Sequence, residues 1–221
     1  LHSSNRRQRQ MCIRDRVTRL IRGLERVRQT EFPVNVVPAV AAMFEGLAPY
    51  QDTANRGQYA SIAQAANDSN YLLSLRLQNP GAHALLRNTC SITRMIGSSK
   101  INVVPAESSE ELDCRLLPDQ DPEKFLTQLR QIINDEQIVI EKIMGFTPAN
   151  SRTATPLFRA LENVAREQHG ARLIPTVAGG FTDSHFFRDL GITSYGYSPF
   201  VFTPSEFTLS LIHISEPTRL D

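Results

Sequence analysis

Apolar side chains recur at helical intervals near the start of the chain. Between residues 17 and 27 their spacings are three, one, three and three, and the intervening side chains are mostly Arg and Glu. This pattern predicts an amphipathic helix, and its apolar positions are Val17, Leu20, Ile21, Leu24 and Val27. Further helical patches at 39–47, 59–66 and 71–77, broken by prolines and a polar run, are interpreted as a helical insertion at about 33–88.

From Asn88 onward, apolar and polar residues tend to alternate along the chain. The segments NTCSITRMIG and SEELDCRLL each predict a strand, and in the first we expect one face to hold Cys90, Ile92, Arg94 and Ile96. Asp121 and Pro122 then form a helix start signal, and the buried stripe of that helix is expected to hold Phe125, Leu129, Ile132 and Ile133. QIVIEKI predicts a further strand. This order predicts a ferredoxin-like β-α-β-β-α-β domain whose first strand is missing.

A second block follows a turn-rich segment near residues 146–152. TPLFRALENVAREQHG predicts a helix that stops at Gly170, and a short strand is expected at 173–177. The loop AGGFTD, a helix at 184–190 and the strand ITSYGYS complete the block. Because helices and strands alternate, this part predicts a mainly parallel sheet, and the fold class is α/β.

The two ends of the chain have an unusual relationship at the level of codons. Residues 11–16 read MCIRDR, and the DNA stretch ATGTGTATAAGAGACAG, read from its first base, encodes this peptide up to the last base of its final codon. The reverse complement of the same stretch, read in the same way, encodes LSLIHI, which is the sequence of residues 209–214. We therefore interpret residues 1–16 and 209–221 as translated sequencing adapter, and we expect residues 1–16 to be disordered.

Charge and cysteine content narrow the possible functions. The whole chain carries a net charge of +1, from 24 basic and 23 acidic residues. The two end segments contain six of the basic and three of the acidic residues, so the remainder is at −2 and gives no support for nucleic-acid binding. No apolar run is long enough to span a membrane. Three cysteines without a CxxC motif argue against a disulfide framework and a thiolate zinc site.

The loop GGFTDSHFFRD is the first candidate for chemistry. Its glycines permit a tight bend, and Thr182 and Asp183 could cap the next helix, whose N-terminus could also attract an anion. From the local sequence alone, a capped helix start without further function is the favoured interpretation. Asp183 and His185 could instead be metal ligands, although residues two apart at a helix start point in different directions.

Asn102 and Arg115 are the second candidate, thirteen residues apart on or beside the two predicted strands. The planar guanidinium of Arg suits a carboxylate, and Asn can donate to a developing oxyanion. Alternatively, Arg115 forms a salt bridge with Asp113 or Glu111 on the sheet surface.

Taken together, these stretches resemble the co-catalytic dizinc metallopeptidase and aminoacylase family, which includes glutamate carboxypeptidase and succinyl-diaminopimelate desuccinylase. The resemblance rests on KINVVPAESSEELDCRLLPDQDP, TPLFRALENVAREQHG and AGGFTDSHFFRDLGITSYGYSPF, and most specifically on N-x-x-P, D-x-R and GG-x-TD. It implies a lid or dimerisation domain at 17–147 that includes the helical insertion. It also implies that 148–208 form the C-terminal part of an α/β zinc-hydrolase domain.

The resemblance further implies roles for individual residues. Asn102 would contact the reacting carbonyl region, Arg115 would hold the free carboxylate of the substrate, and Gly180, Thr182 and Asp183 would line the substrate pocket. The family uses two zinc ions, and the lid mediates a homodimer. The metal ligands would lie upstream of Val17 or just after Thr208, so we expect none in this chain. His213 falls in the adapter-like tail and is not interpreted as a ligand.

Two functions follow from the sequence. In the first, the parent protein is a zinc-dependent amidohydrolase or carboxypeptidase acting on a peptide or N-acyl amino acid with a free carboxylate, and this chain alone is inactive. In the second, the chain is a non-enzymatic dimerisation or small-molecule-binding module. The GG-x-TD loop favours the first, since a plain interaction module has no need for it. The compartment is not determined, and a cytoplasmic location is only a default.

Overall fold

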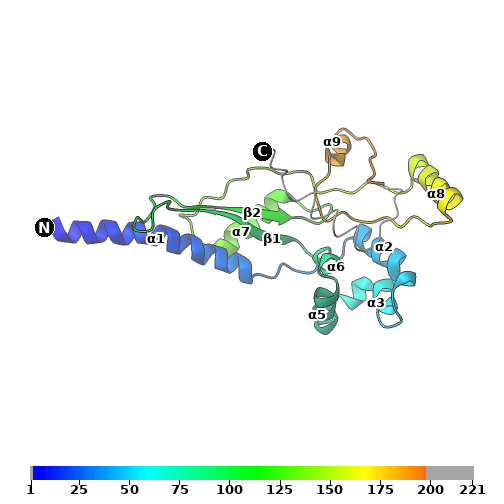
Figure 1. The fold of residues 1–221 in the computed structure, drawn as a ribbon, viewed down its shortest axis with the longest axis horizontal. Coiled ribbons are helices and arrows are strands. Elements are labelled where there is room, and N and C mark those ends of the chain that lie inside the picture. The colour runs from blue at the N-terminus through cyan, green and yellow to red at the C-terminus, as the bar shows by residue number, and fades with distance from the viewer. Residues whose placement is uncertain (1, 198–221) are drawn as a thin grey trace, which may run out of the picture. The chain divides into compact units, whose positions relative to one another are not determined.

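A computed structural model describes residues 2–197 of the 221-residue chain, with side chains described from Arg16 onward. Two compact units form: unit 1 comprises Leu1–Thr153 and Ile174–Thr193, and unit 2 comprises Ala154–Leu173 and the chain from Ser194 onward. The elements (Figure 1) are α1 His2–Gln29, α2 Pro38–Leu47, η1 Ala48–Tyr50, α3 Arg56–Ala60, α4 Ile62–Ala65, α5 Ser69–Gln78, α6 Pro80–Ala84, β1 Thr89–Ile96, β2 Ser109–Arg115, α7 Pro122–Ile133, α8 Pro156–His169 and α9 Ser184–Asp189.

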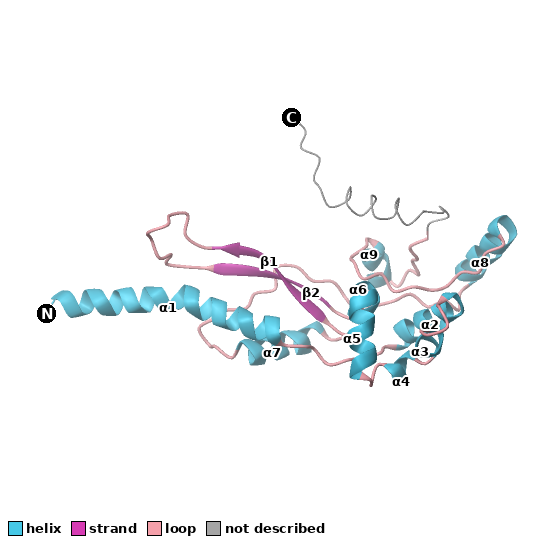
Figure 2. Ribbon diagram, turned by 60° about the horizontal axis from the view of Figure 1, so that its bottom comes forward, coloured by secondary structure: helices cyan, strands magenta, loops and turns pink. Residues whose placement is uncertain are grey.

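An antiparallel hairpin of β1 and β2 forms the sheet of unit 1 (Figure 2). Thr89 lies opposite Arg115 at one end, and Ile96 lies opposite Ser109 at the other. The register shifts between Ile92 and Arg94, because Ile92 pairs with Leu112 whereas Arg94 pairs with the adjacent residue Glu111. Adjacent residues on a strand point to opposite faces of the sheet, so Ile92 and Arg94 also lie on opposite faces. The expectation that Cys90, Ile92, Arg94 and Ile96 share one side is therefore wrong, because the bulge reverses the alternation.

A disulfide joins the two strands. Cys90 lies directly opposite Cys114, with their Cα atoms 4.0 Å apart. The sequence argued against a disulfide framework, since the pairing becomes visible only when the register places these two residues side by side. The structure corrects that expectation, because it contains a disulfide between β1 and β2.

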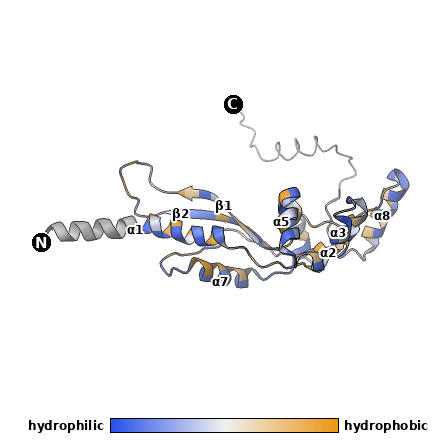
Figure 3. Ribbon diagram, turned by 90° about the horizontal axis from the view of Figure 1, so that it is seen from below, coloured by the Kyte–Doolittle hydropathy of each residue, from blue (hydrophilic) through white to orange (hydrophobic). Residues whose placement is uncertain are grey.

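Helices α1 and α7 cover one face of the hairpin. Val27, Phe32, Phe125, Leu129 and Ile133 form their shared core, and Cys90, Cys114, Ile138 and Ile140 pack against it. Helix α7 confirms its expected start: the Asp121 side chain accepts hydrogen bonds from the backbone N–H groups of Glu123 and Lys124. Its apolar and polar faces are visible in Figure 3. The expected order of helix, two strands and helix is therefore confirmed.

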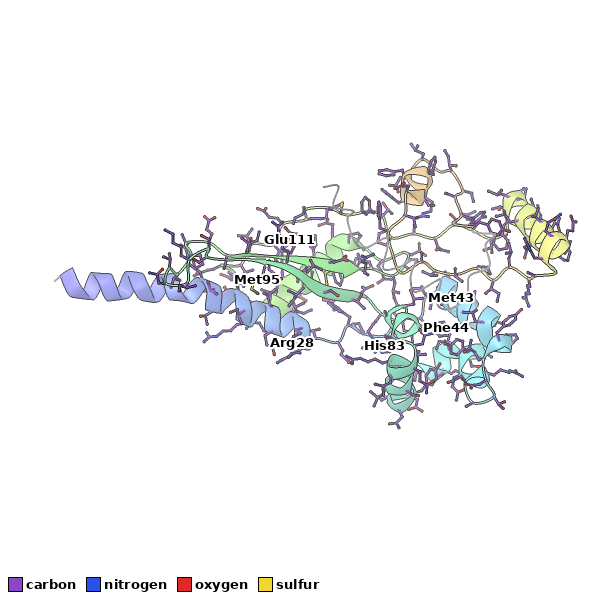
Figure 4. All side chains as sticks on the ribbon, in the orientation of Figure 1. Arg28, Met43, Phe44, His83, Met95 and Glu111 are labelled. Atoms are coloured by element: carbon purple, nitrogen blue, oxygen red, sulfur yellow. A yellow bond between two sulfur atoms is a disulfide. The ribbon has the colours of Figure 1, made fainter. Side chains whose placement is uncertain are left out.

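The helical insertion has a core of its own, centred on α2. Val40, Phe44 and Leu86 are its most deeply buried side chains, and Met43 lies beside Phe44 on the same helix (Figure 4). The backbone N–H of Val177 lies 3.5 Å from the sulfur of Met43. The segment that follows α8 thus packs on the insertion.

Three expected strands are absent from the described residues. QIVIEKI at 137–143, the segment 173–177 and the described part of ITSYGYS, residues 192–197, have no ladder partner. Ile138 and Ile140 still point into the core of unit 1, which explains the alternation that suggested a strand. The chain is a mixed α/β fold, but the part the structure describes contains a two-stranded sheet where we expected larger ones.

Residues 2–16 also differ from expectation, because they continue α1 as a helix where we expected disorder. No Pro or Gly interrupts the chain between His2 and Arg22, and Arg, Gln and Met favour helix. Among the described helices, none combines the length and the apolar character needed to cross a membrane.

Unit 2 is built around α8. The Thr155 hydroxyl accepts a hydrogen bond from the backbone N–H of Phe158, and Gly170 ends the helix in the left-handed conformation with φ of 61°. This confirms the stop expected at Gly170. The hydroxyl groups of Thr155 and Tyr195 lie 2.6 Å apart, which ties the start of α8 to the segment after α9.

Candidate functional site

Arg115 is the last residue of β2, and its guanidinium pairs with a carboxylate from the same strand. Its Nε and Nη2 donate to Oδ2 of Asp113, at 3.0 and 2.6 Å. Side chains two residues apart on a strand share a face, so the contact needs no other element. Half of the Arg115 side chain remains exposed, at 49%. The salt-bridge interpretation of Arg115 is therefore confirmed, and the side chain also remains open to a ligand.

The loop with two glycines lies against the same guanidinium. Arg115 Nη1 lies 3.4 Å from the carbonyl oxygen of Gly179, across 64 residues of sequence. A Cβ on Gly180 would lie 3.9 Å from that nitrogen. The structure thus brings together the D-x-R and GG-x-TD segments, two candidates that sequence analysis identified separately. The Gly179 carbonyl was not among the expected site residues, and the paired glycines were the only sequence signal for it.

Thr182 and Asp183 precede α9 but do not cap it as expected. Asp183 occupies the N-cap position with helical backbone angles and makes no side-chain capping bond. The loop is instead closed by the Thr182 carbonyl, which accepts from the backbone N–H of His185 at 3.3 Å and lies 3.0 Å from its ring Nδ1. A capping side chain needs an extended N-cap backbone, which Asp183 lacks.

His185 is held inside an aromatic cluster. It is 4% exposed, and its ring centroid lies 4.1 Å from that of Phe146, 5.1 Å from that of Phe181 and 3.7 Å from that of Phe186. With Nδ1 on the Thr182 carbonyl, this ring fixes the loop that carries Gly179 and Gly180. The interpretation of His185 as a metal ligand beside Asp183 finds no support in this arrangement.

Asn102 lies in the tip of the hairpin, away from the other candidates. It is exposed, in the turn closed by the Val103 N–H on the Lys100 carbonyl. The tip adjoins the Ile96 and Ser109 pair, whereas Arg115 pairs with Thr89 at the opposite end of the ladder. The six steps along β2 from Ser109 to Arg115, at about 3.3 Å each, separate Arg115 from the start of the tip by about 20 Å. Within one chain, Asn102 and Arg115 do not form one site.

Near that tip, β2 also carries two adjacent glutamates with different surroundings. The Glu111 carboxylate pairs with the guanidinium of Arg94 at 2.9 Å. Both carboxylate oxygens of Glu110 are covered and have no hydrogen-bond partner among the described residues. Burial, with the neighbouring charge of Glu111, raises the pKa of Glu110 above its ordinary value.

No group of three or more His, Cys, Asp or Glu side chains that could hold a metal occurs among the described residues. The donor set there does not fit a pair of zinc ions, which needs several nitrogen and oxygen ligands converging on one place. His213 lies outside the described residues.

Comparison with known proteins places these segments in a family. Residues 18–141 match the model M20_dimer, a peptidase dimerisation domain. Aminoacylase-1A of Rattus norvegicus is 32% identical over 135 residues, which is 58% of this chain and 33% of that protein. Probable carboxypeptidase S-like 2 of Dictyostelium discoideum is 24% identical over 130 residues, which is 58% of this chain and 25% of that protein.

Among solved structures, the M20 family metallo-carboxypeptidase Sso-CP2 from Sulfolobus solfataricus is similar, with a TM-score of 0.48 and 17% identity, over 80% of this chain and 48% of that chain. The chain spans about a quarter to a third of the length of the two curated relatives. The family model covers more than half of the chain, and it includes both strands and Arg115. The chain belongs to the M20 peptidase family.

Proposed function

We propose that the chain carries the lid and the carboxylate-recognition part of an amidohydrolase. Its substrate would be a peptide or an N-acyl amino acid with a free carboxylate. Residues 17–147 would act as the lid, and 148–208 would contribute to the catalytic domain. The proposal agrees with the names of two relatives, an aminoacylase and a probable carboxypeptidase S-like protein.

The observation that carries the proposal is the contact between Arg115 and the Gly179 carbonyl. It joins a guanidinium, which can grip a carboxylate, to a glycine loop whose backbone can approach a ligand closely. Arg115 would hold the substrate carboxylate. Gly180, Thr182 and Asp183 would line the same site from the loop, which His185 stabilises.

The hydrolytic step would depend on two zinc ions, as the family resemblance implies. Because the described residues do not offer a fitting donor set, the ligands would come from elsewhere in the parent protein. We accordingly expect this chain alone to show no hydrolysis and no tight stoichiometric zinc. Metal analysis of the purified chain tests the second point, and two zinc ions per chain would contradict it.

A homodimer through the lid is the second part of the proposal. The outer half of the hairpin and its tip expose six apolar side chains to solvent: Ile92, Met95, Ile96, Ile101, Val103 and Val104. A surface of this kind often marks a protein contact. Asn102 lies in the same tip, so in a dimer it could act at a site of the partner subunit. Sedimentation equilibrium of the chain and of an Ile101→Glu, Val103→Glu variant tests this, and a wild-type monomer at all concentrations would contradict it.

The carboxylate role is tested by ligand binding, which does not require the hydrolytic step. N-acetyl-L-leucine and its neutral amide are titrated into the wild-type chain, the Arg115→Ala variant and the matched control Arg94→Ala. We expect the wild type and the control to prefer the acid by about tenfold and Arg115→Ala to lose the preference. An unchanged preference in Arg115→Ala would remove its assigned role.

A further inference from the structure

The salt bridge between Asp113 and Arg115 uses only one of the two carboxylate oxygens. Both Nε and Nη2 of the guanidinium donate to one oxygen of Asp113, Oδ2, and Nη1 donates to the carbonyl oxygen of Gly179. The contacts come from two segments, the strand that carries Arg115 and the loop before α9. Together they engage all three nitrogens of the guanidinium.

A guanidinium has five N–H groups. Three of them have partners among the described residues, so two remain, one on Nη1 and one on Nη2. Two N–H groups on neighbouring nitrogens match the two oxygens of a carboxylate, which is the arrangement of bidentate recognition. The edge of the guanidinium that includes Nε, by contrast, is already occupied by Asp113.

We propose that Asp113 is a positioning residue for carboxylate recognition: it holds the guanidinium of Arg115 so that one N–H of Nη1 and one of Nη2 are available to the ligand. The inference rests on the proposed function and adds a residue to it. It also defines the ligand group, because two parallel N–H donors suit a planar carboxylate better than a neutral amide.

The physical basis is conformational entropy. An Arg side chain loses substantial rotamer freedom when a ligand fixes it, and a half-exposed side chain retains that freedom unless a neighbour restrains it. Asp113 restrains Arg115 before the ligand arrives, so less freedom is lost on binding. The neighbouring pair of Arg94 and Glu111 lacks this geometry, because it has one bond at 2.9 Å and, within the described part of the chain, no second contact from a loop. It therefore provides a matched control.

The experiment measures binding of N-acetyl-L-leucine and its amide to the full chain by isothermal titration, with Asp113→Ala, Asp113→Asn and the control Glu111→Ala. In parallel, ¹⁵N spectra of the arginine side chains report how freely the Arg115 guanidinium rotates. We expect Asp113→Ala to weaken acid binding about tenfold, to leave amide binding unchanged and to free the rotation. Asp113→Asn retains an acceptor and should stay within about threefold of the wild type. Glu111→Ala should match the wild type.

Wild-type acid affinity in both Asp113 variants, with loss in Arg115→Ala, would overturn the positioning role and leave the proposed function standing. Wild-type acid affinity in Arg115→Ala would overturn both. Backbone amide spectra identify a variant that has failed to fold. In that case Asp113→Val, which also removes the acceptor but favours a strand, takes the place of Asp113→Ala, and wild-type acid affinity in it would overturn the positioning role.

Discussion

Arg115 Nη1 and the carbonyl oxygen of Gly179 lie 3.4 Å apart, although 64 residues separate them in the sequence. The first ends a strand of the hairpin, and the second belongs to the loop before α9. This contact turns two separate sequence motifs into one site.

Replacing Gly180 should affect Arg115 in proportion to the size of the new side chain. A Cβ at this position would lie 3.9 Å from Nη1, which is an ordinary contact distance. We therefore expect Gly180→Ala to bind N-acetyl-L-leucine as the wild type does. Gly180→Val, whose two methyl groups extend further, should weaken binding by about fivefold or more. Titration calorimetry measures both, and Gly97→Val, at a position with open space, serves as the control. Equal affinity in all three variants would argue against the contact.

Gly46 should be needed for packing of the segment after α8. A Cβ there would lie 2.7 Å from Cγ2 of Ile174, so one of the two must move. We expect Gly46→Ala to lower the free energy of unfolding by about 1–2 kcal/mol, because overpacking outweighs the gain in helix propensity. Gly57→Ala, with nothing within 4 Å, should raise it by about 0.5–1 kcal/mol. Urea unfolding measures both, and a stabilised Gly46→Ala would show that Ile174 does not pack on α2.

The disulfide between Cys90 and Cys114 should contribute to the stability of the hairpin. It closes a loop with a sequence separation of 24, for which the chain-entropy estimate is about 3 kcal/mol. We expect the double variant Cys90→Ala, Cys114→Ala to unfold at a lower urea concentration than the oxidised wild type. Reductant should lower the midpoint of the wild type and leave that of the double variant unchanged. Sensitivity of the double variant to reductant would contradict this explanation.

Glu110 should make unfolding depend on pH in a defined direction. Its pKa in the folded state lies above the ordinary value of 4.5, because burial and the charge of Glu111 disfavour the carboxylate. The folded state therefore prefers the protonated group, and stability is lost as pH rises from the unfolded pKa through the folded one. We expect Glu110→Gln to remove this loss and to be more stable than the wild type at neutral pH.

Urea midpoints between pH 3.5 and 7 measure the effect, because this window runs from about 1 unit below the ordinary pKa to about 2.5 units above it. Glu111→Gln separates the two causes, because it removes the charge of Glu111 and leaves the burial of Glu110 in place. Since burial is the larger cause, this variant should keep most of the loss of stability that the wild type shows with rising pH. A Glu110→Gln variant that follows the wild type at every pH would contradict the role of burial.

Local signals in the sequence predicted local structure well. The Asp121 cap, the stop at Gly170 and the order of α1, β1, β2 and α7 all follow from spacing and capping residues, and all are found. Features that depend on register did not follow: the bulge between Ile92 and Arg94 and the disulfide of Cys90 need the pairing of two strands. The strand expected at 137–143 has the right alternation, since Ile138 and Ile140 reach the core, but no partner strand for a ladder.

In the candidate site too, some residues were predicted from the sequence and others were not. Arg115 and Gly180 were identified by residue type and motif, and the structure places them together. The Gly179 carbonyl and the aromatic surroundings of His185 were not foreseen, because they depend on long-range packing between segments about 40–60 residues apart. Asp183 was expected to cap α9, but its backbone angles, which residue type alone does not fix, prevent it.

The most direct test of the account follows the two halves of the site during one titration. N-acetyl-L-leucine is added to the ¹⁵N-labelled chain, while the guanidinium signal of Arg115 and the backbone amide signals of Gly179 and Gly180 are recorded. If one site binds the carboxylate, all of these signals shift together with a single dissociation constant, and the neutral amide shifts them much less. Signals that move with different constants, or an amide that binds as well as the acid, would contradict a single carboxylate site built from Arg115 and the glycine loop.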